Sequence, residues 1–167
     1  VRLIKKAFGK GFLAYNPIGS LKERWRKYML GDTNIKNVLK GLVRFLVLPP
    51  YARVMGRDRG YIYFQEFIPG NDYDIRVVVI GNKAFGIKRM VRKNDFRASG
   101  SGCIIYEKEQ IDPKAVEMSF DFASRIHTQS AAFDFLYWNG ELRLVEISFG
   151  FVKEGYDLCP GYWDKSL

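Results

Sequence analysis

The spacing of apolar positions divides the chain near residue 60. In residues 20–47, apolar residues recur at intervals of three and four, which predicts helices. The pair Ser20 and Glu23 has the spacing of a capping box, so the first helix is expected to begin at Ser20. Gly31-Asp32 predicts a break between two helices, and Pro49-Pro50 predicts the end of the second.

Beyond residue 60 the apolar positions alternate, which is typical of strands. Strands are predicted over 61–68, 73–80 and 83–90, and Gly81-Asn82 is expected to form a two-residue turn between the last two. Residues 91–104 read as a polar, Gly-bearing loop. The upstream residues 1–19 read as a Gly-rich loop after a short strand or helix.

The last third of the chain predicts one helix and one hairpin. Asp112-Pro113 has the form of an N-cap followed by a first-turn proline, and apolar residues then recur at helical spacing. The stretch FDFLYWNGELRLVEISFGF, residues 133–151, reads as two strands joined at Asn139-Gly140. An irregular aromatic tail follows. The pattern as a whole predicts an α+β fold dominated by antiparallel strands.

Composition narrows the class of protein. The 167 residues carry a net charge of +9 and are 47% apolar, which is enough for one packed domain. Residues 20–59 hold ten Lys and Arg against three acids, a balance of +7. Such a segment attracts phosphates, nucleic acid or an anionic membrane surface, although an ordinary solvated helix face explains it equally well.

The chain gives few signs of secretion. The longest apolar run, residues 42–51, is too short to span a bilayer, and the first residues lack the apolar core of a signal peptide. Two cysteines, Cys103 and Cys159, form neither a metal motif nor a disulfide framework, so a cytoplasmic setting is expected. The chain starts without Met and is expected to be a piece of a longer polypeptide.

The first hairpin gathers charged side chains. A two-residue turn at Gly81-Asn82 places Asp74 opposite Arg89, with Arg76 on the same face. Lys88 is expected on the other face. On pattern alone, a structural cross-strand ion pair is favoured over a binding site.

The last hairpin carries two acids, and the length of its loop decides their placement. A two-residue turn would put Asp134 and Glu146 on opposite faces. A three-residue loop, Trp138-Asn139-Gly140, would make them diagonal neighbours on one face. Two carboxylates on one face repel each other unless a cation such as Mg²⁺ lies between them, so the hairpin either separates its acids or forms a metal site. The hypothesis of a metal site depends on the three-residue loop.

Three motifs in this order resemble the ATP-grasp superfamily in its carboxylate–amine ligase branch. YFQEFIPGNDYDIRVVVIGNKAFGIKR resembles the hinge strand and the D-x-R hairpin, FRASGSG the segment that follows, and FDFLYWNGELRLVEIS the closing Asp…Glu-x-Asn hairpin. The resemblance covers about residues 60–150. The tail CPGYWD also resembles ATP-grasp proteins encoded with bacterial cell-surface polysaccharide machinery.

The resemblance implies a fold and a domain plan. The fold would be α+β and ATP-grasp-like, a mainly antiparallel sheet flanked by helices with its N-terminal portion truncated. Residues 1–59 would be a basic, mostly helical variant of the lid subdomain, and residues 60–167 would be the C-terminal subdomain with the metal and phosphate site. The upstream domain of the same polypeptide, with its phosphate-binding Lys, would be missing.

The resemblance also implies ligands and roles. ATP and Mg²⁺ would be the cofactors, and a carboxylate and an amine the substrates. The implied roles are adenine binding by Gln65, Glu66, Phe67 and Ile68; ribose contact or site ordering by Asp74; phosphate binding by Arg89 and Lys88; stabilisation of the transferring phosphoryl group by Arg97; and Mg²⁺ ligation by Asp134, Glu146 and Ser148. Ser148 stands where the family has Asn, which leaves a two-metal site in doubt.

The implied reaction is ATP-dependent activation of a carboxylate as an acyl phosphate, which an amine then attacks. A degenerate ATP-grasp domain that binds a ligand without catalysis is the alternative, favoured by Ser148 and the missing upstream half. A nucleic-acid module is disfavoured, because Tyr61, Tyr63 and Phe67 alternate as a buried sheet face would. His127, at the expected helix end, and Cys159 are expected to be structural. The basic segment 20–59 remains a candidate for peripheral membrane or anionic-surface contact.

Overall fold

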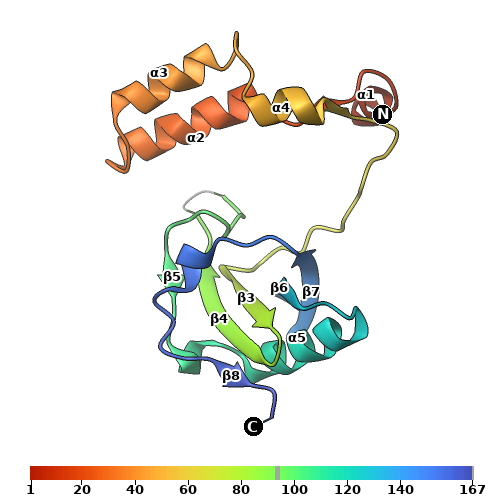
Figure 1. The fold of residues 1–167 in the computed structure, drawn as a ribbon, viewed down its shortest axis with the longest axis vertical. Coiled ribbons are helices and arrows are strands. Elements are labelled where there is room, and N and C mark those ends of the chain that lie inside the picture. Colours follow the sequence, from red (N-terminus) through yellow and green to blue (C-terminus); the bar gives the residue numbers. More distant parts are fainter. Residues whose placement is uncertain (93–94, 167) are drawn as a thin grey trace. The chain divides into compact units, whose positions relative to one another are not determined.

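The chain folds into two compact units, and each has its own architecture. The structure is a computed structural model that describes residues 1–92 and 95–166. Unit 1 comprises Val1–Gln65 and unit 2 comprises Glu66–Leu167. Figure 1 labels the α-helices of both units and the strands of unit 2.

Unit 1 is mostly helical. Its elements are α1 (Arg2–Phe8), β1 (Phe12–Leu13), α2 (Pro17–Met29), α3 (Ile35–Val43), α4 (Pro50–Met55) and β2 (Arg57–Asp58). The helices α2 and α3 lie side by side as a hairpin (Figure 1). The predicted break between two helices near Gly31-Asp32 is confirmed. Pro49-Pro50 does not end the second helix as predicted, because α3 already ends at Val43 and Pro50 is the first residue of α4.

The predicted start of the first helix was wrong. Helix α2 begins at Pro17, and its N-cap is Asn16, whose side chain accepts a hydrogen bond from the Gly19 N–H at 3.1 Å. Ser20 lies inside the helix. Glu23 pairs with Arg26 one turn later, at 2.7 Å, instead of reaching back to a cap. The Asn16-Pro17 pair is a second valid start signal, and it lies one turn earlier than the capping box.

Unit 2 is built around an antiparallel sheet. Its elements are β3 (Tyr73–Ile80), β4 (Lys83–Met90), β5 (Ile104–Ile105), η1 (Lys108–Gln110), α5 (Pro113–Arg125), β6 (Ser130–Trp138), β7 (Glu141–Ser148), η2 (Lys153–Tyr156) and β8 (Trp163–Asp164). The strand order is β5-β4-β3-β6-β7, and β8 also pairs with β4. The α+β class with a mainly antiparallel sheet is confirmed.

One face of this sheet and α5 form the core of unit 2. Ile75 and Val77 of β3 and Phe133 and Phe135 of β6 are buried in one cluster with the apolar side of α5. Figure 1 shows α5 running along the sheet. Asp112 caps α5 as predicted, accepting from the Lys114 N–H at 2.9 Å. Because α5 covers this face, the functional side chains of the central strands lie on the other one.

The predicted strand over 61–68 is absent from the described residues. This segment has no regular structure, and Tyr61, Tyr63 and Phe67 are exposed instead of forming a buried sheet face. The boundary between the two units falls inside it, after Gln65. Alternation alone does not make a strand, since a strand also needs a neighbour whose backbone completes its hydrogen bonds.

Candidate nucleotide and metal site

A buried ion network connects the three central strands on the face that α5 does not cover. Arg89 of β4 forms a two-point contact with Asp74 of β3, at 2.7 Å from Nε to Oδ1 and 2.6 Å from Nη2 to Oδ2. The same Nη2 donates to Asp134 Oδ2 on β6 at 3.0 Å. Arg76 Nη1 donates to that oxygen from β3 at 3.1 Å. Two guanidinium groups therefore converge on one carboxylate.

The register of the first hairpin produces this meeting as predicted. Asp74 pairs with Arg89 and Arg76 pairs with Ile87 across a turn in which Gly81 has a φ of 60°. On its other edge β3 pairs Arg76 with Asp134. Residues that are directly opposite in antiparallel strands share a face, so three strands bring these four charges together. The network is nearly buried, with side-chain exposures between 8% and 14%.

The second hairpin brings its two acids together by a route that the sequence analysis did not predict. The loop has two residues, Asn139 and Gly140, with φ values of 53° and 78°, so the predicted three-residue loop was wrong. Trp138 pairs with Glu141, the register expected to separate the acids. A register shift next to Asp134 then inserts Val145 as an extra residue in β7.

This β-bulge moves Glu146 to the site face. Phe135 pairs with Leu144, but Asp134 pairs with Glu146, so two residues of β7 are used for one step of β6. Without the bulge, Glu146 would lie opposite Phe133 on the core face. With it, both carboxylates lie on one face, as expected, and Ser148 joins them by donating to Glu146 Oε1 at 2.7 Å.

Asp134 retains an oxygen suited to a cation. Its Oδ2 accepts from both arginines, whereas Oδ1 is buried and has no hydrogen-bond partner within the described part of the chain. A buried, unpartnered carboxylate oxygen opposite an exposed Glu146 fits a hard cation that completes its coordination with phosphates and water. Residues 1–92 and 95–166 contain no group of three acidic, His or Cys side chains that could hold a metal without a substrate.

Burial and charge shift the titration of this network. Burial raises the pKa of Asp134 above its usual range, and the guanidinium groups of Arg89 and Arg76 oppose that rise. The pKa of Arg89 lies above its ordinary value, because its bonds to Asp74 and Asp134 outweigh the cost of burial. Arg89 is therefore a fixed positive charge, and its two carboxylates hold it in one orientation.

Tyr156 completes the site and was not predicted. It belongs to η2, in the tail after β7, and its phenol lies close enough to Arg76 and Asp134 for their charges to affect it. Burial raises the pKa of Tyr156 to about 12, against the opposing effect of Arg76. The ring also contacts Phe151 edge-on at a centroid distance of 6.1 Å. No local pattern in the tail distinguishes this tyrosine from its neighbours, so only the folded chain identifies it.

Two predicted phosphate-binding residues do not join the network. Lys88 lies on the opposite face, as its strand position indicated, where its Nζ contacts Gln110 Oε1 at 3.0 Å and lies 4.0 Å from the centre of the Tyr73 ring. Arg97 lies in the loop after β4 and forms an exposed pair with Asp95. Their contacts with a nucleotide remain predictions.

The segment predicted to bind adenine has no strand to hold it. Gln65, Glu66, Phe67 and Ile68 lie at the boundary between the units, and Ile68 is the one that is half-buried. Phe67 contacts Phe96 edge-on with ring centres 5.2 Å apart, which ties the end of this segment to the loop that carries Arg97. A role in adenine binding remains a prediction.

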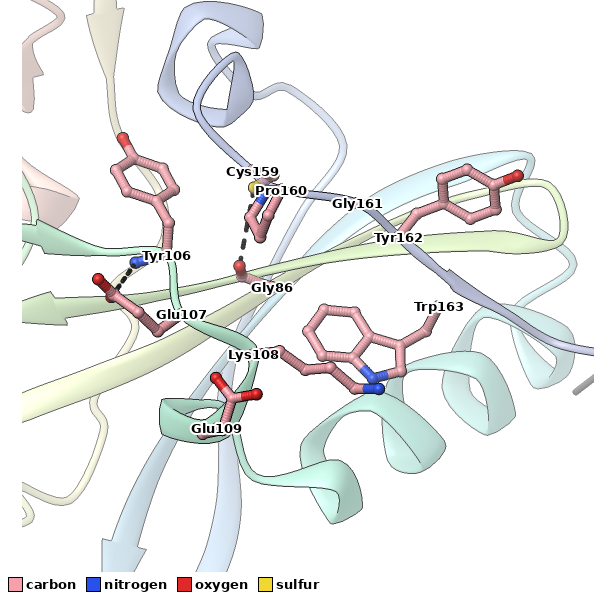
Figure 2. A pocket seen from close by; sticks show the side chains of 10 residues that line it. All are labelled: Gly86, Tyr106, Glu107, Lys108, Glu109, Cys159, Pro160, Gly161, Tyr162 and Trp163. Carbon is pink, nitrogen blue, oxygen red and sulfur yellow. Dashed lines mark hydrogen bonds between the residues drawn. The ribbon is translucent and has the colours of Figure 1, made fainter.

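A separate cavity of about 430 Å³ opens at the outer edge of β4, between β5 and β8 (Figure 2). Its lining includes Tyr106, Trp163 and Gly86 but none of the predicted site residues. Cys159 lies over its floor, with Sγ 3.8 Å from the Gly86 carbonyl oxygen. Burial raises the pKa of Cys159, which disfavours the reactive thiolate.

The comparisons with known proteins now bear on this geometry. A family model described as the RimK-like ATP-grasp domain matches residues 52–155. A search of the curated proteins found no match to the chain. The matched residues include the whole of the ion network except Tyr156, and an ATP-grasp domain suggests ATP-dependent ligase activity. The chain belongs to the RimK-like ATP-grasp family.

Proposed function

We propose that this domain uses ATP and Mg²⁺ to activate a carboxylate as an acyl phosphate, which an amine then attacks. The observation that carries the proposal is the buried Oδ1 of Asp134, which has no hydrogen-bond partner among the described residues and lies beside two arginines, with Glu146 opposite Asp134 on the neighbouring strand. This arrangement supports the proposal, because a metal–triphosphate complex needs carboxylates for the ion and positive charges for the phosphates.

The reaction needs no nucleophile from the protein. An oxygen of the substrate carboxylate forms a bond to the γ-phosphorus of ATP while the bond to the β,γ-bridging oxygen breaks, and ADP leaves. The amine nitrogen then forms a bond to the acyl carbon, the bond from that carbon to the phosphate oxygen breaks, and phosphate and a proton are released. The protein supplies alignment and charge neutralisation for both steps.

The side chains divide this work. Asp134 and Glu146 would hold Mg²⁺, with the Ser148 hydroxyl orienting Glu146 through the 2.7 Å hydrogen bond. When bound, the ion would neutralise charge on the β- and γ-phosphates. Arg89 keeps Asp134 in place through Nη2, and the rest of its guanidinium adds positive charge next to the phosphates. Arg76, beside Tyr156, fixes the same carboxylate from the neighbouring strand.

Other roles in the proposal come from the family pattern. Gln65, Glu66, Phe67 and Ile68 would contact adenine, Asp74 would order Arg89, and Lys88 and Arg97 would reach phosphate oxygens after closure of loops on the nucleotide. Residues 1–59 would be a variant lid and residues 60–167 the C-terminal subdomain. An upstream domain of the same polypeptide would supply the first phosphate-binding Lys and much of the substrate specificity.

A second candidate is a degenerate domain that binds nucleotide without transferring phosphate. Ser148 in place of the family's Asn supports it. In this structure the Ser148 hydroxyl is directed to Glu146, and one oxygen of Asp134 is already shared between two arginines. The remaining oxygen ligands suit one Mg²⁺ better than two, and a one-metal site favours binding over rapid transfer.

Calorimetry of Mg²⁺ with a non-hydrolysable ATP analogue tests the shared part of both candidates. We expect Glu146→Gln to weaken Mg-dependent nucleotide binding by at least about 100-fold, since it removes an anionic ligand at an exposed position without disturbing the core. Asp134→Asn should do the same. Glu141→Gln is the matched control, because Glu141 is an exposed acid of the same strand that pairs with Arg143. Unchanged affinity in both site variants would overturn the metal site.

Hydroxylamine trapping then separates the two candidates. With Mg-ATP, a pool of carboxylic acids and hydroxylamine, a ligase forms hydroxamates and ADP, because hydroxylamine replaces the amine in attack on the acyl phosphate. Binding without hydroxamate or ADP, in the longest natural form of the polypeptide, would assign the domain to the ligand-binding class.

A further inference from the structure

The two units divide the charge of the chain very unequally. Residues 1–65 contain 14 Lys and Arg and three Asp and Glu, a net charge of +11. Residues 66–167 contain 13 Lys and Arg and 15 Asp and Glu, a net charge of −2. The positive net charge of the protein therefore belongs entirely to unit 1. Unit 1 also carries many exposed apolar side chains, and on the hairpin of α2 and α3 they form an ordered surface.

The hairpin has a defined packing face. Val38 and Gly41 of α3 are buried, and a side chain at Gly41 would lie within about 3 Å of Leu21 and Arg24 of α2. Arg24 also donates from Nη1 to the Asn37 carbonyl oxygen at 3.1 Å. Leu21 and Arg24 therefore face α3, and Val38 and Gly41 face α2.

Each helix presents an apolar row that the other helix does not cover. On α3 and the turn after it, the row has the spacing i, i+4, i+7, i+11. On α2 the apolar residues have the spacing i, i+7, i+11, and Lys22 occupies position i+4. Exposed fractions in the two rows run from 45% to 90%. The rows are formed by Ile35, Leu39, Leu42 and Leu46, and by Ile18, Trp25 and Met29.

The two rows lie on the same side of the hairpin. At about 100° per residue, each row is displaced by roughly 90–100° from the packing residues of its own helix, in the same rotational sense. The helices are antiparallel neighbours (Figure 1), so equal displacements in the same sense turn both rows to one side. Lys22 lies on this side, and Lys36 and Lys40 lie along the outer flank of α3, all three exposed.

We propose that this face, made of the two rows with Lys22, Lys36 and Lys40, docks on an anionic lipid surface. An apolar row sinks into the boundary between headgroups and acyl chains, while lysines beside it contact lipid phosphates and carboxylates. None of the helices in the described ranges is long and apolar enough to cross a membrane, so the hairpin lies in the surface. Binding to nucleic acid would use the lysines but leave aliphatic Leu39 and Leu42 without a role.

The test is vesicle co-sedimentation of the whole 167-residue chain. Vesicles of phosphatidylcholine with about 30% phosphatidylserine should bind the protein at least about tenfold more strongly than pure phosphatidylcholine vesicles. Lys36→Glu with Lys40→Glu should reduce that binding at least about tenfold. The matched control is Lys114→Glu with Lys165→Glu, which makes the same change in net charge at exposed positions of unit 2 and should bind as the unchanged protein does.

A second pair of variants tests the apolar rows. Leu39→Ala with Leu42→Ala should weaken vesicle binding by about tenfold and leave the helical circular dichroism intact, since both side chains are half exposed and alanine favours a helix. Val152→Ala with Leu158→Ala, two exposed apolar residues of unit 2, is the control. Brominated lipids should quench part of the tryptophan fluorescence of the bound protein. A Trp25→Phe variant, which keeps Trp138 and Trp163, should lose this quenching.

Three results would overturn the proposal. They are equal binding to charged and neutral vesicles, equal losses in the hairpin and control variants, and tight binding of mixed-sequence RNA that the Leu39→Ala, Leu42→Ala protein retains. The last result would assign the basic charge to nucleic acid instead of lipid. None of these results depends on nucleotide binding in unit 2, so this test and that of the ligase are independent.

Discussion

Unit 1 and unit 2 handle their charged groups in opposite ways. Unit 2 buries Asp134 and Arg89 and surrounds them with partners, so each charge is held in one place. Unit 1 leaves most of its basic residues exposed, and its ion pair between Arg26 and Glu23 is half-exposed on the surface of a helix. The buried charges are suited to ordering a metal and a triphosphate, whereas the exposed charges are suited to contact with an extended anionic surface.

The two units also differ in what holds them together. Unit 2 has a continuous core in which Ile75, Val77, Phe133 and Phe135 are no more than 2% exposed. The buried apolar residues of unit 1 are Ala7, Val38 and Ala52, which are small. A short segment with so little apolar burial gains modest stability by itself. Unit 1 should therefore unfold more easily. Unit 2 should lose stability mainly through substitutions in its core and its ion network.

The largest contrast is expected from removing one large apolar side chain in each unit. Phe133→Ala in unit 2 should lower the free energy of unfolding by about 3–5 kcal/mol, because it removes a fully buried ring and leaves a cavity. Leu46→Ala in unit 1, at a side chain that is 90% exposed, should change it by less than about 0.5 kcal/mol. Urea unfolding followed by far-UV circular dichroism measures both. Similar losses would show that the two units share one core.

The next contrast concerns arginine pairs. Arg89→Met should cost about 3–5 kcal/mol of unfolding free energy, because it leaves Asp74 without its two-point partner and Asp134 with one arginine fewer. Arg26→Met, which breaks the half-exposed pair with Glu23, should cost no more than about 1 kcal/mol. Added salt should weaken the effect at Arg26 and leave that at Arg89 almost unchanged. An Arg89→Met protein as stable as the original would mean that the network contributes nothing net to folding.

Sequence rules predicted the parts of unit 2 that depend on local chemistry. The turn at Gly81-Asn82 sets the register of β3 against β4, and this alone predicted the pairing of Asp74 with Arg89. Asp112 and Pro113 marked the start of α5. Each of these features depends on a few neighbouring residues and a single backbone geometry.

Features that depend on distant residues were missed or reached for the wrong reason. The sequence analysis predicted a three-residue loop that would bring Asp134 and Glu146 to one face. The loop has two residues, and a bulge at Val145 shifts the register so that both acids still lie on one face. A bulge is stabilised where core residues such as Leu144 stay inward while a polar residue further along turns outward, and that depends on the opposite strand. Tyr156 lies in the tail, and no periodicity connects it with Arg76.

Tyr156 allows a test of how tightly the tail closes the site of unit 2. A tyrosine in the unfolded chain ionises near pH 10, whereas burial raises the pKa of Tyr156 to about 12 in the folded protein. Between these values the folded state keeps a proton that the unfolded state has lost, so stability should fall as the pH rises through this window, by up to about 2–3 kcal/mol. Tyr156→Phe should remove this part of the pH dependence.

Urea unfolding at several pH values between 9 and about 12 measures the effect. Tyr61→Phe, at a side chain that is 64% exposed in unit 1, is the matched control and should keep the full slope. If unfolding free energy depends on pH equally in the two variants, the tail does not bury Tyr156 beside Arg76 in solution. The contrast between buried charged groups in unit 2 and exposed ones in unit 1 then weakens.

The smallest contrast uses one glycine in each unit. At Gly86 of β4, an added Cβ would lie 2.8 Å from Ile111 Cγ2 and 3.1 Å from the Trp163 ring, two groups held by the core of unit 2. At Gly41 of α3 it would lie 2.9 Å from Arg24 Cδ and 3.0 Å from Leu21 Cδ1, on side chains that can move. Gly86→Ala should therefore cost about 1–3 kcal/mol of unfolding free energy. Gly41→Ala should change it by less than about 1 kcal/mol, because the preference of alanine for a helix offsets the crowding. A larger loss of unfolding free energy at Gly41 than at Gly86 would mean that the packing around Gly41 in unit 1 is more rigid than the packing around Gly86 in unit 2.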